Sequence, residues 1–371
     1  MATADDGELG RRALLRGVGA LAGLGVMPGC EREQASKPPE SPPGEPQPAP
    51  TADAPVAGEA SMRALQIDDY IGELNELALR PLAIPEAGDR EVIVAVKAVA
   101  LNPVDVAIAR GGLKRFVPLK FPAILGWDLA GDVAGVGAGV EGYAVGDAVY
   151  AGLGYLGGAF ASYARVPVDS LAHAPKRLSP AQQAALPLVS CTTVQAMAKV
   201  SFAKGAKVLV LGGAGGVGST AVQWLVHNGA GRVVATASET KLETVRKLGA
   251  EVIDYRNDDW SAKLAGADFD IVYDTVGDDN APTRATKVMR DGGHYLAIAG
   301  NIGDTAALGD KYHFEFFATR PSGADLATVT AAVDAGGITP LLFKEFAFEQ
   351  IVDAYTLTAE RVAVGKIVAT L

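Results

Sequence analysis

The sequence is poor in the residues that build metal sites and disulfide frameworks. Its 371 residues include two cysteines, Cys30 and Cys191, and four histidines that lie far apart. Two cysteines cannot form a disulfide framework or a four-thiolate zinc site, and scattered histidines do not indicate a metal centre. We therefore expect no bound metal.

Positive charge and long apolar runs are scarce as well. Lys and Arg total 33 against 43 Asp and Glu, which gives a net charge of -10. A surface for nucleic acid needs clustered cations, so nucleic acid is not an expected partner. The apolar stretch 17–27 is too short and too rich in glycine to span a bilayer as a helix. The hydrophobic content of 49% is nevertheless ample for packed cores, and the length favours two domains with a tail.

Residues 1–30 have the pattern of a targeting segment. Arg11 and Arg12 precede the apolar stretch, and Cys30 follows a small residue. This order resembles a twin-arginine export signal ending in a lipobox. It predicts export to a bacterial periplasm or cell envelope, with membrane anchoring through a lipid on Cys30. The alternative is an inert terminus on a cytoplasmic protein.

The rest of the chain divides by composition. Within residues 31–60, eight of the nineteen residues from 37 to 55 are proline, which favours an extended, disordered linker. Residues 61–186 contain short apolar strands separated by Gly- and Pro-rich turns, which predicts a mostly β domain. Strands and helices then alternate from residue 187 to about 325, which is typical of a parallel sheet.

A glycine-rich turn follows the first strand of this second half. Strand 207–211 is apolar, and helix 216–228 places Val217, Ala221 and Leu225 on one face. The turn between them fits G-x-G-x-x-G, which in this context predicts a pyrophosphate bound by backbone amides at the helix start. With strands at 232–237, 251–254, 269–274 and 294–299 and a helix near 282–289, we expect a Rossmann doubly wound parallel sheet. The predicted cofactor-binding residues of the turn are Gly213, Gly215, Gly216, Val217 and Gly218.

The ends of the other strands indicate which dinucleotide binds. No acid stands at the tip of strand 232–237, where a carboxylate would repel a 2′-phosphate. Ser238 can donate a hydrogen bond and Lys241 can supply charge, so NADPH is the predicted cofactor, although Glu239 lies close and Lys241 could be a solvated helix residue. Val276, Ala299 and Asn301 follow strands that end at the expected cleft.

Five ordered motifs occur between residues 62 and 371. They are Ala100-Leu101-Asn102-Pro103-Val104-Asp105, Ile124-Leu125-Gly126-Trp127-Asp128-Leu129-Ala130-Gly131, Val145-Gly146-Asp147-Ala148-Val149-Tyr150, Ala214-Gly215-Gly216-Val217-Gly218 and Gly365-Lys366-Ile367-Val368. Together they resemble the zinc-independent branch of the medium-chain dehydrogenase/reductase superfamily, the quinone oxidoreductase-like proteins. The resemblance implies a GroES-like, mostly β catalytic domain over residues 61–186, a Rossmann NADP-binding domain over 187–325, and a return segment over 326–371.

The resemblance also implies a reaction. Zinc-bearing relatives have Gly-His-Glu where this chain has Gly126-Trp127-Asp128, so no zinc ligand triad can be assembled. Reduction of an already polarised small molecule, a quinone or an α,β-unsaturated carbonyl, is therefore expected, with NADPH as hydride donor.

The same resemblance assigns roles to single residues. Asn102 and Asp105 are the candidate catalytic residues, and the alternative is a turn pair around Pro103. Thr192 matches a threonine near the nicotinamide, or it caps or packs its helix. Tyr255 and Arg361 match positions that approach the 2′-phosphate, or they are exposed polar groups.

Three functional hypotheses remain open at the level of sequence. The first is an exported NADPH-dependent reductase, the second a low-turnover NADPH-binding sensor or binding protein of the cell envelope, and the third a cytoplasmic reductase with a vestigial leader. By analogy with the family, a homodimer is expected, with residues 313–318 as the edge strand that would pair.

Overall fold

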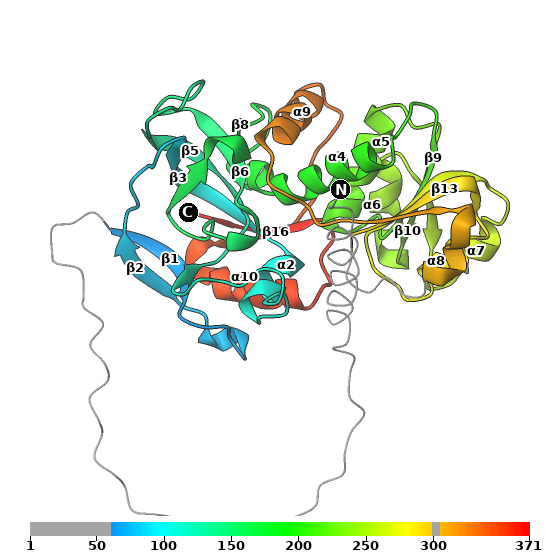
Figure 1. Cartoon of the computed structure of the whole chain (residues 1–371), viewed down its shortest axis with the longest axis horizontal. Helices are drawn as coiled ribbons and strands as arrows, with labels where there is room; N and C mark the ends of the chain where they lie inside the picture. The colour runs from blue at the N-terminus through cyan, green and yellow to red at the C-terminus, as the bar shows by residue number, and fades with distance from the viewer. Residues whose placement is uncertain (1–60, 299–304) are drawn as a thin grey trace, which may run out of the picture.

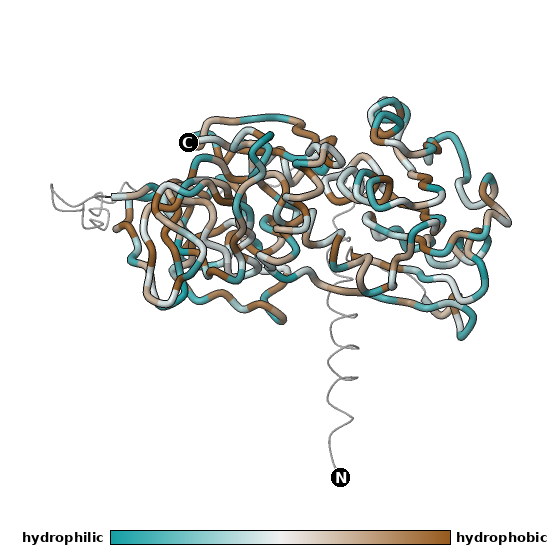
Figure 2. The backbone as a smooth tube through the Cα atoms, turned by 90° about the horizontal axis from the view of Figure 1, so that it is seen from above, coloured by the Kyte–Doolittle hydropathy of each residue, from teal (hydrophilic) through white to brown (hydrophobic). Residues whose placement is uncertain are grey.

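A computed structural model describes residues 61–298 and 305–371. The chain forms two lobes that lie side by side (Figure 1), each built on its own β-sheet. Seen from above, hydrophobic residues run through the interior of both lobes (Figure 2). The predictions made for residues 1–60 lie outside the described part of the chain. Within that part, no helix is both long enough and apolar enough to cross a membrane.

The second lobe is a six-stranded parallel sheet in the order β11-β10-β9-β12-β13-β14. Its strand β9 (Lys207–Leu211) is buried after the first residue, as expected for a strand covered on both faces. Counted from β9, the strand order is 3-2-1-4-5-6, so the predicted doubly wound sheet is confirmed. The other strands are β10 (Arg232–Ala237), β11 (Glu251–Asp254), β12 (Phe269–Asp274), β13 (Met289–Ala297) and β14 (His313–Phe316).

Helices complete this lobe. Helix α5 (Gly216–His227) follows β9 and buries Ala221 and Leu225 completely, on the face predicted from the sequence. The expected helix over 282–289 is wrong in extent, because α8 covers only Ala281–Ala285 and Met289 already begins β13. The polar and glycine residues at the start of β13 conceal the strand from a search for apolar runs. The remaining helices are α4 (Pro187–Lys199), α6 (Leu242–Lys247) and α7 (Trp260–Lys263).

The first lobe is organised by one long strand, β3 (Glu91–Leu101), which pairs antiparallel with three others. Two of them, β5 and β7, come from the same part of the sequence, but β16 belongs to the end of the chain. The return of the chain to the first lobe is visible in Figure 1. The strands of this sheet and of the small sheet beside it are β1 (Ser61–Ile67), β2 (Leu79–Ala83), β4 (Ala123–Ile124), β5 (Asp128–Val136), β6 (Ala148–Gly152), β7 (Tyr163–Pro167), β8 (Leu171–His173), β15 (Leu342–Ala347) and β16 (Lys366–Thr370).

Three elements near the junction of the lobes were not predicted. Helix α2 (Pro103–Ala109) follows β3 directly, and α10 (Ile351–Ala359) packs against it. Strand β15 pairs parallel with β16 at the edge of the first sheet. The remaining helices are α3 (Pro180–Ala184) and α9 (Gly323–Asp334). Their apolar residues pack against the same sheet and form one hydrophobic core with it.

Candidate functional site

A cavity of about 610 Å³ lies where the two lobes meet. The first lobe contributes Asn102, Pro103 and Lys366 to its wall, and the second contributes the turn between β9 and α5. The carboxyl ends of parallel strands, where ligands bind in such sheets, therefore open into this cavity. Of the predicted site residues, those that line it are Asn102, Gly215, Gly216, Val217, Ser238, Lys241, Tyr255, Val276 and Arg361.

The glycines of the turn have different tasks. A Cβ on Gly213 would stand 2.7 Å from Cβ of Ala235 on β10, and a Cβ on Gly218 would stand 2.1 Å from the carbonyl oxygen of Gly212. These two glycines do not line the cavity, and they permit close packing within the lobe. Gly215 lines the cavity, and the nearest atom to its added Cβ is 3.5 Å away. Its missing side chain leaves room in the cavity for a ligand.

The turn has the donor groups for a diphosphate. Gly215 is the N-terminal cap of α5 in extended conformation, and the helix begins at Gly216. The first amides of a helix have no partner within the helix, and the helix dipole adds partial positive charge there. Gly216 and Val217 line the cavity at this point. The residues present thus fit the diphosphate of a dinucleotide.

Cationic side chains gather at the adjacent end of the cavity. Lys241 donates from Nζ to the carbonyl of Val362 at 3.1 Å, which ties the second lobe to the loop after α10. Arg361 belongs to that loop and has a φ of 56°, an uncommon conformation for a residue other than glycine. Ser238 and Tyr255 line the same end, and Glu239 does not. These cationic and hydroxyl side chains are suited to the 2′-phosphate that NADPH carries on its ribose.

The charged residues Arg284 and Asp278 also line the cavity, and neither was predicted as a site residue. Arg284 lies over the ring of Trp260 at 4.4 Å and forms ion pairs with Asp259 and Asp278. Hydrogen bonds from Arg284 and Ser261 hold the pKa of the Asp259 carboxyl well below its usual range. Because its charge is already balanced, Arg284 shapes the wall more than it attracts an anion. As one cation in the short helix α8, Arg284 gives no distinctive signal in the sequence.

The loop after β12 is held by a buried carboxylate. Asp274 accepts hydrogen bonds from the amides of Val276 and Gly277 at 2.8 and 2.9 Å and from the Tyr295 hydroxyl at 2.6 Å. Burial raises the pKa of Asp274 despite these bonds. Val276 is thereby fixed at the cavity wall. The other two residues predicted at strand ends, Ala299 and Asn301, lie outside the described residues.

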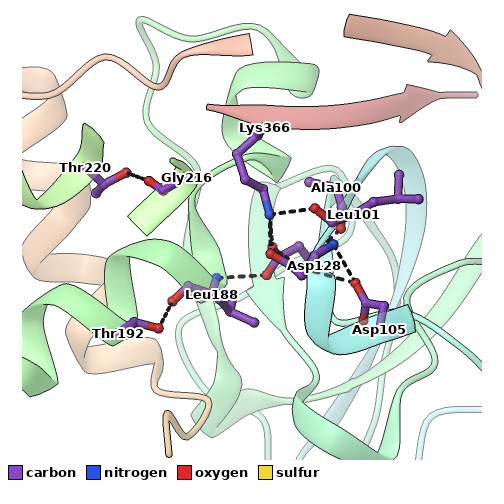
Figure 3. A network of polar contacts seen from close by, with 10 residues as sticks. Ala100, Leu101, Asp105, Asp128, Leu188, Thr192, Gly216, Thr220 and Lys366 are labelled. Carbon is purple, nitrogen blue, oxygen red and sulfur yellow. Dashed lines mark hydrogen bonds and ion pairs between the residues drawn. The ribbon is translucent and has the colours of Figure 1, made fainter. Parts of the chain in front are cut away.

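Asp105, Asp128 and Lys366 lie in a buried polar cluster (Figure 3), and Asn102 is hydrogen-bonded to all three. The side-chain amide of Asn102 donates to Asp128 Oδ2 at 2.9 Å and to Asp105 Oδ2 at 3.3 Å, and its oxygen accepts from Lys366 Nζ. Asp105 also accepts from the Asn102 backbone amide at 2.8 Å, at the start of α2. The structure thus brings the two predicted catalytic residues together, with Asn102 at the cavity wall and Asp105 behind it.

Burial perturbs the acids of this cluster. Desolvation, reinforced by the nearby Asp128, raises the pKa of Asp105 to about 7, against the opposing effect of Lys366. Burial likewise raises the pKa of Asp128, although Lys366 and the Asn102 amide lower it. From the sequence, Asp128 and Lys366 were identified only as members of two family motifs and not as site residues. A charged residue directly before an apolar stretch of a strand, as in both cases, was the signal that could have identified them.

Thr192 does not line the cavity. Its hydroxyl donates to the carbonyl of Leu188 at 2.6 Å and lies 2.6 Å from the hydroxyl of Thr319. It therefore packs α4 against the segment before α9, one helical turn from the cavity residues Leu188 and Val189. This placement corresponds to the packing alternative raised from the sequence.

The fold and the cavity together define a dinucleotide-dependent oxidoreductase with a separate catalytic lobe. Residues 88–176 match the family described as alcohol dehydrogenase GroES-like domain, and residues 248–368 match the one described as zinc-binding dehydrogenase. In the part of the chain that the structure describes, no group of three or more His, Cys, Asp or Glu residues could hold a metal ion.

Several characterised proteins are similar over most of the chain. The 2-methylene-furan-3-one reductase of Solanum lycopersicum is 34% identical over 83% of this chain and 79% of its own. The NADPH-dependent alkenal/one oxidoreductase, chloroplastic, of Arabidopsis thaliana is 34% identical over 86% and 81%. The structure of a quinone oxidoreductase from Coxiella burnetii has a TM-score of 0.76 at 25% identity, covering 84% of this chain and all of its own.

These similarities place the chain in a family. The chain belongs to the medium-chain dehydrogenase/reductase superfamily, among its quinone oxidoreductase-like members. The expected GroES-like catalytic domain and Rossmann domain are confirmed with it.

Proposed function

We propose that this protein is an NADPH-dependent reductase of quinones or α,β-unsaturated carbonyl compounds. The observation that carries the proposal is the composition of one cavity. A diphosphate cradle and the cations Lys241 and Arg361 form one part of its wall, and an apolar wall of Leu101, Leu188 and Ile367 forms another. Relatives named 2-methylene-furan-3-one reductase and NADPH-dependent alkenal/one oxidoreductase support the same reaction.

The residues present would divide the work as follows. The amides at the start of α5 would bind the diphosphate, and Ser238, Lys241, Tyr255 and Arg361 would surround the 2′-phosphate. When bound, NADPH supplies a hydride from C4 of its nicotinamide. The apolar wall near Asn102 would hold an uncharged substrate and exclude water from the reacting carbon. In enone reduction, the hydride adds to the β-carbon and a proton from water completes the α-carbon.

Steady-state oxidation of NADPH by the full-length protein tests this proposal. A simple 1,4-quinone and a medium-length 2-alkenal serve as alternative acceptors, and a saturated aldehyde of equal length serves as the matched control. We expect turnover with a conjugated acceptor, none with the saturated aldehyde, and weaker activity with NADH. Binding of NADPH without turnover of any conjugated acceptor would favour the sensor hypothesis instead.

We also propose that the protein is exported and anchored at the envelope through Cys30. The support is the order of the twin arginines, the apolar stretch and the cysteine in residues 1–30. Twin-arginine routes carry folded proteins, which would allow an enzyme to leave the cytoplasm with its dinucleotide bound. A cytoplasmic enzyme is the alternative, and fractionation distinguishes the two.

We further propose a homodimer that forms through strand β14 (His313–Phe316). This strand is at the end of the six-stranded sheet, so one of its edges has no neighbour in that sheet. Light scattering on the purified protein tests the proposal. A wild-type mass twice the chain mass is expected, and Phe314→Pro, which removes a backbone donor from the edge, should lower it towards the monomer.

A further inference from the structure

The junction of the lobes contains an ion pair that the proposed reaction does not use. Asp128, at the start of β5, is fully buried, and Lys366, at the start of β16, is 5% exposed. Lys366 Nζ lies 3.2 Å from Asp128 Oδ2, although the two residues are 238 positions apart in the chain. A buried pair seldom adds net stability, because removing both charges from water costs about as much as their attraction returns. Its presence beside the cavity therefore calls for another role.

The Asp128 carboxylate ties together three elements around the cavity. Oδ2 accepts from Lys366 and from the Asn102 side-chain amide. Oδ1 accepts from the backbone amide of Leu188 at 2.8 Å, in the first turn of α4. Asn102, Leu188 and Lys366 all line the cavity. One buried carboxylate, which does not itself line the cavity, thus holds three residues of the cavity wall in place.

Lys366 is placed to hold and not to react. Its ammonium group donates to the carbonyl of Leu101 at 3.0 Å, to Asn102 Oδ1 and to Asp128, so its three donors are all engaged. Its alkyl chain lies beside the dinucleotide turn, because a Cβ on Gly216 would stand 3.0 Å from Lys366 Cδ. The same side chain therefore touches the cradle and orients the Asn102 amide.

We propose that Asp128 and Lys366 are positioning residues for hydride transfer. They fix the Asn102 amide and the start of α4 in one arrangement relative to the dinucleotide turn, so that the wall opposite the nicotinamide is formed before substrate binds. The inference rests on the proposed reductase function. Hydride transfer is sensitive to such placement, since a displacement of about 1 Å can cost about 100-fold in rate.

A merely structural ion pair is the rival explanation, and single substitutions cannot separate the two. Removal of one partner would leave an uncompensated buried charge and could unfold the protein. The paired variant Asp128→Asn with Lys366→Met removes both charges and keeps the side-chain sizes close. Lys366→Arg keeps the charge and serves as the conservative variant. Lys97→Met with Asp132→Asn is the matched control, because this more exposed pair also takes its acid from β5 and joins that strand to its neighbour β3.

The experiment compares these full-length variants by thermal unfolding, NADPH calorimetry and single-turnover hydride transfer to a conjugated acceptor. We expect the paired variant to fold and to bind NADPH within about threefold of wild type, with transfer slowed about 100-fold. Lys366→Arg should recover part of the rate, and the exposed-pair control should match wild type. A folded paired variant with the wild-type transfer rate would overturn the proposal. A loss of rate no greater than the loss of NADPH affinity would overturn it too.

A second measurement, hydrogen exchange followed by NMR, does not need turnover. The NMR signal of the Asn102 side-chain amide is identified because it is missing in Asn102→Ala. In wild type with NADPH bound, this amide should exchange slowly with solvent. It should exchange rapidly in the paired variant. Retained protection there would contradict the positioning role. Failure of the wild type to reduce any conjugated acceptor would instead contradict the proposed function, and the exchange result would still decide whether the pair orients Asn102.

Discussion

Gly218 packs so closely on Gly212 that a Cβ on the first would lie 2.1 Å from the carbonyl oxygen of the second. Gly215, three residues earlier, has no such neighbour, because the nearest atom to its added Cβ is 3.5 Å away. The same motif therefore contains one glycine that close packing of the fold requires and one that this packing does not require. The two are separable by experiment.

Gly215→Ala should weaken dinucleotide binding and spare the fold. Its backbone conformation, with φ of −73°, suits any residue, and a methyl group here would occupy space at the cavity wall. We expect a Tm within about 2 °C of wild type and an NADPH Kd raised about tenfold or more in calorimetry. Gly218→Ala should instead lower the free energy of unfolding by about 2 kcal/mol or more. Equal destabilisation by both substitutions would contradict this division.

Lys241→Ala and Arg361→Ala should each weaken the binding of NADPH much more than the binding of NADH. Both residues line the cavity at the end where the 2′-phosphate is proposed to bind. Because a charged hydrogen bond to phosphate contributes about 1.5 kcal/mol or more, the Kd for NADPH should rise about tenfold, and the Kd for NADH should barely change. Lys247→Ala, on an exposed position of α6, is the control. A parallel loss of affinity for both cofactors would show that these cations do not read the 2′-phosphate.

The stability of the protein should depend on pH through Asp105. Its pKa is raised from 3.8 to about 7 in the folded state, so between these values the folded protein holds a proton that the unfolded chain has released. Stability contributed by the neutral acid is complete below about pH 4 and is lost as pH rises through about 7.

Asp105→Asn tests this dependence in urea unfolding at a series of pH values. The wild type should lose on the order of 1 kcal/mol per pH unit between pH 5 and 7 relative to the variant. Asp128 and Lys366 lie near position 105 in both proteins. Comparing the two proteins therefore largely removes the contribution of these two residues to the pH dependence of unfolding. If the free energies of unfolding of the two proteins change with pH in parallel, the titrating group is not Asp105.

Changing Arg11 and Arg12 together to Lys should retain the protein in the cytoplasm. The expectation follows from the twin-arginine pattern, in which lysine does not replace the pair. Fractionation of cells that express the full chain measures the distribution. Cys30→Ser should separately release exported protein from the membrane fraction. Wild-type protein found only in the cytoplasm would support the alternative of a vestigial leader.

The parts of this protein that could be predicted from sequence depend on local patterns. The unit β9, glycine turn and α5 was predicted because a buried strand, a turn with five glycines and an amphipathic helix follow one another within about 20 residues. The strand order followed from the alternation of strands and helices. Strand β15 was missed because its centre, Phe343 to Glu345, is exposed and lacks an apolar run.

The candidate site was predicted where its residues follow a strand and missed where they meet from afar. Ser238, Tyr255 and Val276 come just after strands of one parallel sheet, so their common location was foreseeable. Asp128 and Lys366 are 238 positions apart in the chain and meet only because β16 pairs with β3 beside β5. No local pattern encodes that contact. The engaged donors of Asn102 were likewise visible only in the structure.

The most direct test of the central claim is the transfer of deuterium from labelled NADPH. The full-length protein is incubated with an α,β-unsaturated ketone and NADPH deuterated at either the 4R or the 4S position, and the product is analysed by mass spectrometry and NMR. The account predicts one deuterium at the β-carbon from one of the two labelled cofactors and none from the other. Saturated product without deuterium from either cofactor, or NADPH bound with no product at all, would contradict it.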